Sequence, residues 1–110
     1  MPIRFSKKPQ HTREIRVALG RLNLHTIALE HALLSGSLSK IEEEAGAVEE
    51  HLIEGMRLSN YIGSNIKLRR AWIQQRSTSL RTLEMVRNLL DESLKALIAL
   101  IDEVEHERRD

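Results

Sequence analysis

The chain has 110 residues, with 17 Lys and Arg against 16 Asp and Glu, one residue each of Trp, Tyr and Phe, and no cysteine. This composition excludes disulfides, thiolate metal sites and cysteine nucleophiles. Because aliphatic residues must supply the core, it favours helices packed on helices over β-sheet. A protein that binds polyanions is more often basic throughout than alternately basic and acidic, as this chain is.

The first ten residues are basic and lack the apolar core of a secretory signal. We expect them to form a flexible arm before a single helical domain at residues 11–110. The longest unbroken apolar run, Leu97–Ile101, is far too short to cross a membrane. These features predict a soluble, cytoplasmic protein that does not act at a membrane.

A first helix is predicted from near Thr12 to about Ser35. Gly36 follows at a position where helices often end in a left-handed residue. The link at residues 36–38 is short, so the next helix should run antiparallel to the first. The apolar stripe of this first helix comprises Ile15, Leu19, Leu22, Leu29 and Leu33.

The second helix has the clearest start, because Ser39 and Glu42 have the spacing of a capping box. Its expected buried face is Ile41, Ala45, Val48, Leu52 and Met56. The small residues Gly55, Ser59 and Gly63 follow at steps of four. They indicate either a close helix crossing or merely tolerated glycines, and the sequence does not decide between the two.

The end of the second helix is ambiguous, because Gly, Ser and Asn cluster around Gly63. The apolar spacing set at Ile41 nevertheless keeps its phase through Ile62, Ile66, Ile73 and Leu80. This favours one long helix over residues 40–76, bent near Gly63, followed by a turn and a third helix over residues 79–107. Tight turns at both Gly63 and Ser77 would instead give four helices.

The C-terminal segment, residues 80–104, has the widest apolar face in the chain. Its apolar residues recur at alternating steps of three and four, interrupted only by Arg87. Such a face must be buried, against this chain or a second copy. We therefore predict an all-α antiparallel bundle of three, or alternatively four, helices that is completed as a homodimer. The stripe consists of Leu80, Leu83, Leu90, Leu94, Leu97, Ile101 and Val104.

The segment Leu38–Met56 resembles the helix-turn-helix of bacterial repressors of the TetR kind. Ile41, the pair Ala45-Gly46, Leu52 and Met56 fit the apolar anchors and the turn of that motif. The resemblance implies a DNA-reading helix. The segment departs from the pattern at position 42, where Glu replaces a small residue. Its reading helix would carry glutamates and no Lys or Arg, so we expect no DNA binding here.

The basic segment Lys67–Arg76 contains the only tryptophan. Trp and Arg are enriched at protein interface hot spots. We predict that Trp72 lies at the edge of the buried face, next to a core-facing Ile73. If the chain folds back near Gly63, acidic residues of the second helix should neutralise this segment. If the second helix is straight, the same pairing could come from an antiparallel second subunit. The partner-binding candidates are Tyr61, Arg69, Arg70, Trp72 and Arg76, and the acidic residues are Glu49, Glu50 and Glu54.

No Ser, His and Asp share a readable catalytic spacing, and no glycine-rich phosphate loop occurs. Glu103 and His106 have the Glu-x-x-His spacing of di-iron bundles, but the second copy of the motif that such a site requires is absent. We expect no catalytic residue, cofactor, metal or small-molecule substrate.

The predicted function is a non-enzymatic interaction module, such as a regulatory antagonist, an adaptor or a chaperone-like protein that presents a helix to a larger protein. The alternative is a nucleic-acid-associated protein that uses the basic arm and Lys67–Arg76.

Overall fold

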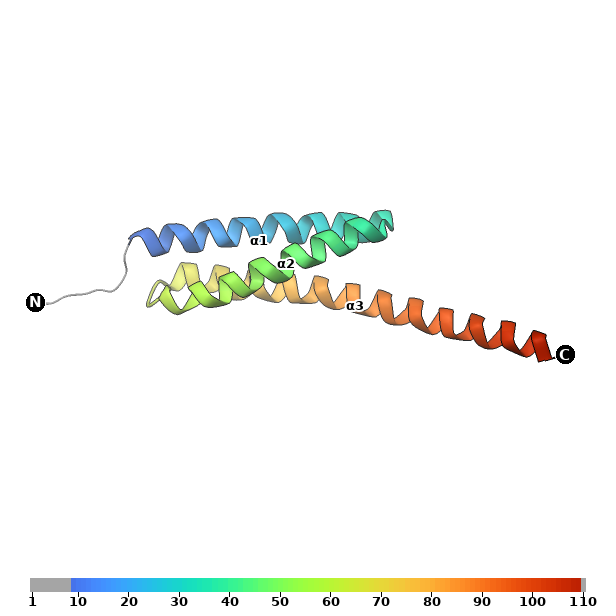
Figure 1. Ribbon diagram of the computed structural model, residues 1–110. Coiled ribbons are helices and arrows are strands. Elements are labelled where there is room, and N and C mark those ends of the chain that lie inside the picture. The colour runs from blue at the N-terminus through green and yellow to red at the C-terminus, as the bar shows by residue number, and fades with distance from the viewer. Residues whose placement is uncertain (1–8, 110) are drawn as a thin grey trace, which may run out of the picture.

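The computed structural model describes residues 9–109, and every regular element within them is a helix. The chain forms α1 (Pro9–Ser35), α2 (Leu38–Leu58), the short 3₁₀ helix η1 (Ser59–Tyr61) and α3 (Ile66–Arg109). The helix α2 folds back along α1, and α3 then reverses direction again and continues well past the α1–α2 turn (Figure 1). The expected all-α fold with three principal helices is confirmed, and no fourth α-helix is present among residues 9–109.

The turn between α1 and α2 follows the predicted chemistry, with two shifts in position. Gly36 has a positive φ of 73° and its N–H donates to the carbonyl of Ala32 at 3.0 Å. The cap of α2 is Ser37 rather than Ser39, and its hydroxyl accepts from the N–H of Lys40 at 3.4 Å. The helix α1 begins at Pro9 instead of near Thr12. The rest of the expected arm, residues 1–8, lies outside the described residues.

The prediction of one long helix over residues 40–76 is wrong. Gly63 adopts a φ of 65°, which ends helical geometry, and the side chain of Asn65 caps α3 by accepting from Leu68 N–H at 3.0 Å. The apolar residues keep the same spacing on both sides of this break, but they lie on a buried face of α2 and on an exposed face of α3. Ile41 is buried on α2, whereas Ile73 on α3 is 54% exposed.

The expected turn at residues 77–79 is also absent, because these residues lie inside α3. Ser79 does not cap a helix. It is fully buried, and its hydroxyl hydrogen-bonds Thr26 of α1 at 2.9 Å and accepts from Gln75 at 3.1 Å. These bonds satisfy its polar group inside the bundle, so no helix break is needed there.

The core lies between α1, α2 and the first half of α3. Its buried apolar residues are Ile15, Ala18, Leu22, Leu29, Ala32, Ile41, Val48, Leu52, Leu58, Ile62, Leu68, Trp72 and Val86. The predicted stripes of the first two helices are largely confirmed, except that Met56 is exposed. Gly55 is buried in its place, against the Trp72 ring.

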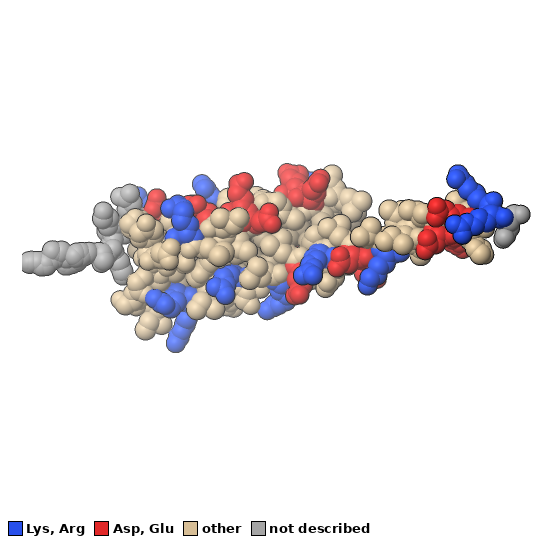
Figure 2. Space-filling view, turned by 60° about the horizontal axis from the view of Figure 1, so that its bottom comes forward, with Lys and Arg blue, Asp and Glu red and all other residues tan. Residues whose placement is uncertain are grey.

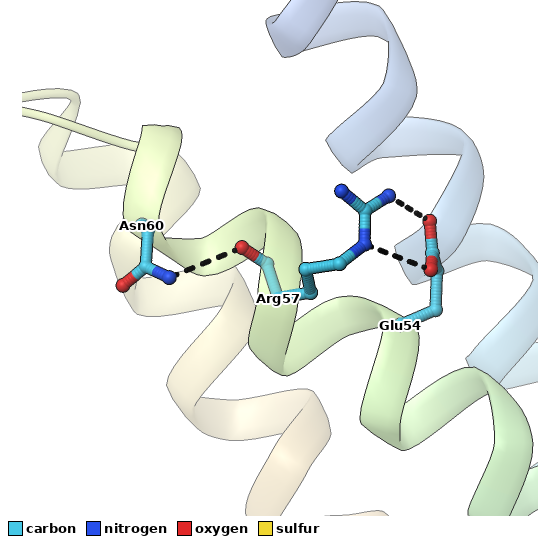
Figure 3. A network of polar contacts seen from close by, with 3 residues as sticks. All are labelled: Glu54, Arg57 and Asn60. Carbon is cyan, nitrogen blue, oxygen red and sulfur yellow. Dashed lines mark hydrogen bonds and ion pairs between the residues drawn. The ribbon is translucent and has the colours of Figure 1, made fainter.

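Side-chain hydrogen bonds join residues at the end of α2 and in η1 (Figure 3). The Arg57 guanidinium donates to both carboxylate oxygens of Glu54, at 2.6 and 3.2 Å. This hydrogen-bonded pairing lowers the pKa of Glu54 and raises the pKa of Arg57. The side-chain amide of Asn60 donates to the carbonyl of Arg57 at 3.3 Å. Together these contacts occupy polar groups in the last turn before η1.

The helix α3 is much longer than the helices that cover it. Its 44 residues span about 66 Å, whereas the 27 residues of α1 span about 40 Å. The described chain is consequently elongated, with principal extents of 84 × 23 × 17 Å. We call residues 66–87 of α3 the bundle half and residues 88–109 the tail. Every described residue of the tail is exposed.

Candidate interaction surface on the third helix

An exposed apolar stripe runs along the whole of α3. Residues seven apart lie close to one line of the helix surface, with a drift of about 20° per heptad, and along this line the side chains are exposed on both the bundle half and the tail. Arg87, in the middle of the line, interrupts its apolar character. We call this line the α3 stripe, and it consists of Ile66, Ile73, Leu80, Arg87, Leu94 and Ile101.

On the tail, a second exposed line widens the α3 stripe. Leu90, Leu97 and Val104 each lie three or four residues from the stripe residues, and all three are about half exposed. The two lines have the spacing of the apolar seam found in coiled coils. Large apolar residues thus remain exposed on this segment, most of which extends past α1 and α2 (Figure 1).

On the bundle half, residues of the α3 stripe line a shallow groove whose lining comes entirely from α3. Apolar Ile73, Leu80 and Leu83 lie there beside three arginines, one serine and one acidic residue, Glu84. Apolar side chains next to an excess of positive charge suit an acidic amphipathic helix better than a small polar molecule. The remaining lining residues are Arg76, Ser77, Arg81 and Arg87.

The two halves of α3 carry opposite charge. The bundle half has six basic side chains and only Glu84 as an acid, and the tail has six acidic side chains against three basic ones. Figure 2 shows acidic residues gathered near the C-terminal end, next to the basic residues of the last turn. The acidic residues of the tail are Asp91, Glu92, Asp102, Glu103, Glu105 and Glu107, and the basic residues of the bundle half are Lys67, Arg69, Arg70, Arg76, Arg81 and Arg87.

The expected neutralisation of the basic segment by α2 is not observed. Among the described residues, Arg57 pairs with Glu54 of its own helix, and Glu44 hydrogen-bonds His25 of α1. Arg69 hydrogen-bonds the carbonyl of Gly63 instead. The chain does fold back near Gly63, but the helices pack through their apolar faces, and Glu49 and Glu50 remain exposed. The positive charge of the bundle half therefore stays at the surface.

The structure places the five partner-binding candidates in different environments. Arg69, Arg70 and Arg76 are exposed on the bundle half. Tyr61 lies in η1, where its ring stacks on His11 with centroids 4.2 Å apart. The expected position of Trp72 at the edge of the buried face is wrong, because it is only 6% exposed. The neighbouring residue Ile73, expected in the core, takes the exposed position instead.

Trp72 is buried because Gly55 leaves room for its ring. A Cβ built on Gly55 would lie 2.5 Å from Trp72 Cζ3, which is closer than real contacts allow. From the sequence, the row of Gly55, Ser59 and Gly63 indicated either a close helix crossing or merely tolerated glycines. At Gly55 the close approach is real, but it accommodates an indole ring rather than a second backbone.

The segment that resembles a helix-turn-helix contains no turn. Leu38–Met56 lies entirely within the uninterrupted helix α2, and Ala45 and Gly46 have helical geometry. The Ala-Gly turn that the resemblance requires is therefore absent.

A cluster of His25, Glu44 and His51 was not foreseen from the sequence. His25 Nδ1 lies 2.8 Å from Glu44 Oε1, and the rings of His25 and His51 stack with centroids 5.0 Å apart. The sequence could have indicated this cluster only if the alignment of α1 against α2 had already been known. Within residues 9–109, no three or more His, Asp or Glu side chains are placed to hold a metal ion, Glu103 and His106 included.

No family model, curated protein or solved structure matches the chain. None of the described helices is both long and apolar enough for a membrane span.

Proposed function

We propose that this protein is a non-enzymatic interaction module whose binding surface is the α3 stripe with its flanking tail residues. One observation carries the proposal: half of a 44-residue helix extends beyond its own bundle with an ordered line of exposed apolar residues. Leaving such a line in water is unfavourable, because burial of each large aliphatic side chain is worth about 1.5–3 kcal/mol. A partner that covers the tail would recover this free energy.

The shape of the surface supports a helical partner. A straight helix with apolar residues at alternating steps of three and four packs best against another helix of similar pattern. The short bundle then acts as the rigid base that fixes the direction of the tail. An adaptor or a regulatory antagonist that presents a helix to a larger protein in this way needs no catalytic residue.

Nucleic acid is the lesser candidate. The exposed arginines of the bundle half favour it, but Trp72 is buried, and no exposed tryptophan is left to stack on a base. Fluorescence anisotropy with single-stranded and duplex oligonucleotides at low salt would test it. Salt-sensitive binding that is lost on Arg69→Ala and Arg70→Ala would favour this alternative.

The main proposal is tested by photocrosslinking in cells that express the protein. A photoreactive phenylalanine analogue replaces Leu97 in one variant, and Glu92, which lies off the apolar lines of the tail, in a matched control. We expect adducts from position 97 and few from position 92. Absence of adducts from position 97, with the protein folded and abundant, would refute the proposed binding surface.

A further inference from the structure

We infer that the partner of the α3 stripe is α3 of a second copy of this chain, running antiparallel. In this arrangement the tail of each copy lies along the groove on the bundle half of the other. The inference rests on the proposed function, because it names the partner of the same surface.

The stripe residues are spaced almost evenly on both sides of the middle of α3. The midpoint of α3 (Ile66–Arg109) falls between Arg87 and Asn88. The stripe has apolar residues seven and fourteen positions before Arg87, and again seven and fourteen positions after it. An antiparallel pair with Leu80 opposite Leu97 is centred between Asn88 and Leu89, one residue from this midpoint, and therefore overlaps along nearly the entire helix. In this register Ile73 also meets Val104 and Leu83 meets Leu94, whereas Arg76 and Arg87 lie opposite Ile101 and Leu90.

Charge selects the antiparallel direction. A parallel pair would place the basic bundle halves side by side and the acidic tails side by side, which is unfavourable. An antiparallel pair brings each acidic tail to a basic bundle half. Glu105 and Glu107 of one copy then lie near Arg69 and Arg70 of the other, and these arginines form no ion pair among the described residues of their own chain.

The same direction accounts for Arg87 inside an otherwise apolar stripe. In a parallel pair, the two Arg87 side chains occupy the same layer and repel each other. In the antiparallel pair, Arg87 packs its aliphatic part against Leu90 of the second copy, next to Asp91. A charged residue at one central position also fixes the register of the two helices.

The chain contains no cysteine, so thiol crosslinking reads the direction of the pair directly. Ser77 and Ile98 are exposed and each follows a stripe residue by four positions, so in the antiparallel pair they lie side by side across the interface. Within one chain they are about 31 Å apart along the helix, beyond the reach of a short bismaleimide. The experiment mixes the full-length Ser77→Cys and Ile98→Cys variants and compares the mixture with each variant alone.

We expect a crosslinked dimer from the mixture and little from either variant alone. Efficient crosslinking of Ser77→Cys with itself would show a parallel pair and overturn the inference. A dimer by light scattering that gives no crosslink would place the interface elsewhere and also overturn it. A monomer at about 100 µM would remove the second copy as partner, but photocrosslinks from position 97 to another protein would leave the proposed function standing.

A charge reversal tests the pairing of the two ends. Arg69→Glu with Arg70→Glu should weaken self-association at least about tenfold, and so should Glu105→Arg with Glu107→Arg, because each opposes like charges at both ends of the dimer. An equimolar mixture of these two variants should recover wild-type affinity. Unchanged affinity of both separate variants would overturn the inference. In a parallel pair, positions 69 and 70 of the two copies face each other, so charge reversal replaces repulsion between positive charges by repulsion between negative charges and should change the affinity little.

Discussion

At the scale of single residues, the contact between Gly55 and Trp72 determines how α3 sits on α2. The indole occupies the space that a side chain at position 55 would need, and it is the largest side chain in the core. The two glycines of α2, Gly46 and Gly55, therefore differ in their surroundings. Gly55 makes room for a ring, whereas a Cβ on Gly46 would meet no atom within 4 Å.

We expect Gly55→Ala to destabilise the fold by about 1–3 kcal/mol, the usual cost of overpacking. Gly46→Ala is the matched control in the same helix, and it should stabilise the fold by up to about 1 kcal/mol through helix propensity. Urea unfolding followed by circular dichroism measures both. Equal effects of the two substitutions would show that Trp72 does not pack against Gly55.

Trp72 and Ile73 form a second matched pair. Trp72→Ala should cost about 3–5 kcal/mol of unfolding free energy, because it leaves a large cavity in the core. Ile73→Ala should change the stability of the dilute chain by no more than about 0.5 kcal/mol, since its side chain is exposed. Thermal melts at low micromolar concentration compare them. A small loss for Trp72→Ala together with weakened association would restore the interface role predicted from the sequence.

At the scale of elements, α3 is one helix with two environments. Its bundle half is held by apolar contacts and by the buried hydrogen bond between Thr26 and Ser79, which ties α3 to α1. Its tail is exposed at every residue from 88 to 109. The two halves should therefore respond differently to the same kind of substitution.

The buried hydrogen bond gives a prediction for the bundle half. Ser79→Ala should destabilise the fold by about 1 kcal/mol, because Thr26 keeps its second bond to the carbonyl of Leu22 at 2.7 Å. Ser77→Ala, two residues away and exposed, serves as control and should be close to neutral. Denaturant unfolding at one fixed protein concentration measures the difference. A neutral Ser79→Ala would mean that the bond contributes no stability.

At the scale of the whole molecule, an 84 Å monomer with an uncovered tail would be an unusual resting state. The exposed tail is a helix of about six turns, which is marginal in water without packing. Association should therefore protect the tail far more than the bundle. This difference can be observed without any substitution.

We expect amide hydrogen exchange in residues 88–109 to speed up when the protein is diluted from about 100 µM to below 1 µM. Exchange in the α1–α2 hairpin should change much less, because its hydrogen bonds lie in the folded bundle at both concentrations. Mass spectrometry of peptic peptides resolves the two regions. Exchange in the tail that does not depend on concentration would count against self-association.

The local sequence determined much of this protein by itself. Apolar spacing located the buried faces of α1 and α2, and Gly36 marked the turn between them. The wide stripe after Leu80 marked an apolar helix face, because helical periodicity is a short-range property of residues three and four positions apart. The predicted class, an all-α fold with three helices, followed from the same pattern.

Tertiary structure alone decided where α3 starts and which way each of its faces points. The spacing through Ile66, Ile73 and Leu80 is equally regular for a buried and for an exposed line, so the pattern could not reveal that the break at Gly63 turns it away from the core. Ser79 has the sequence character of a cap, and only the neighbouring Thr26, 53 residues away, makes it a buried helical residue. Trp72 likewise entered the core because Gly55 provides the space. In each case the deciding contact joins residues far apart in the chain, and local periodicity carries no information about such contacts.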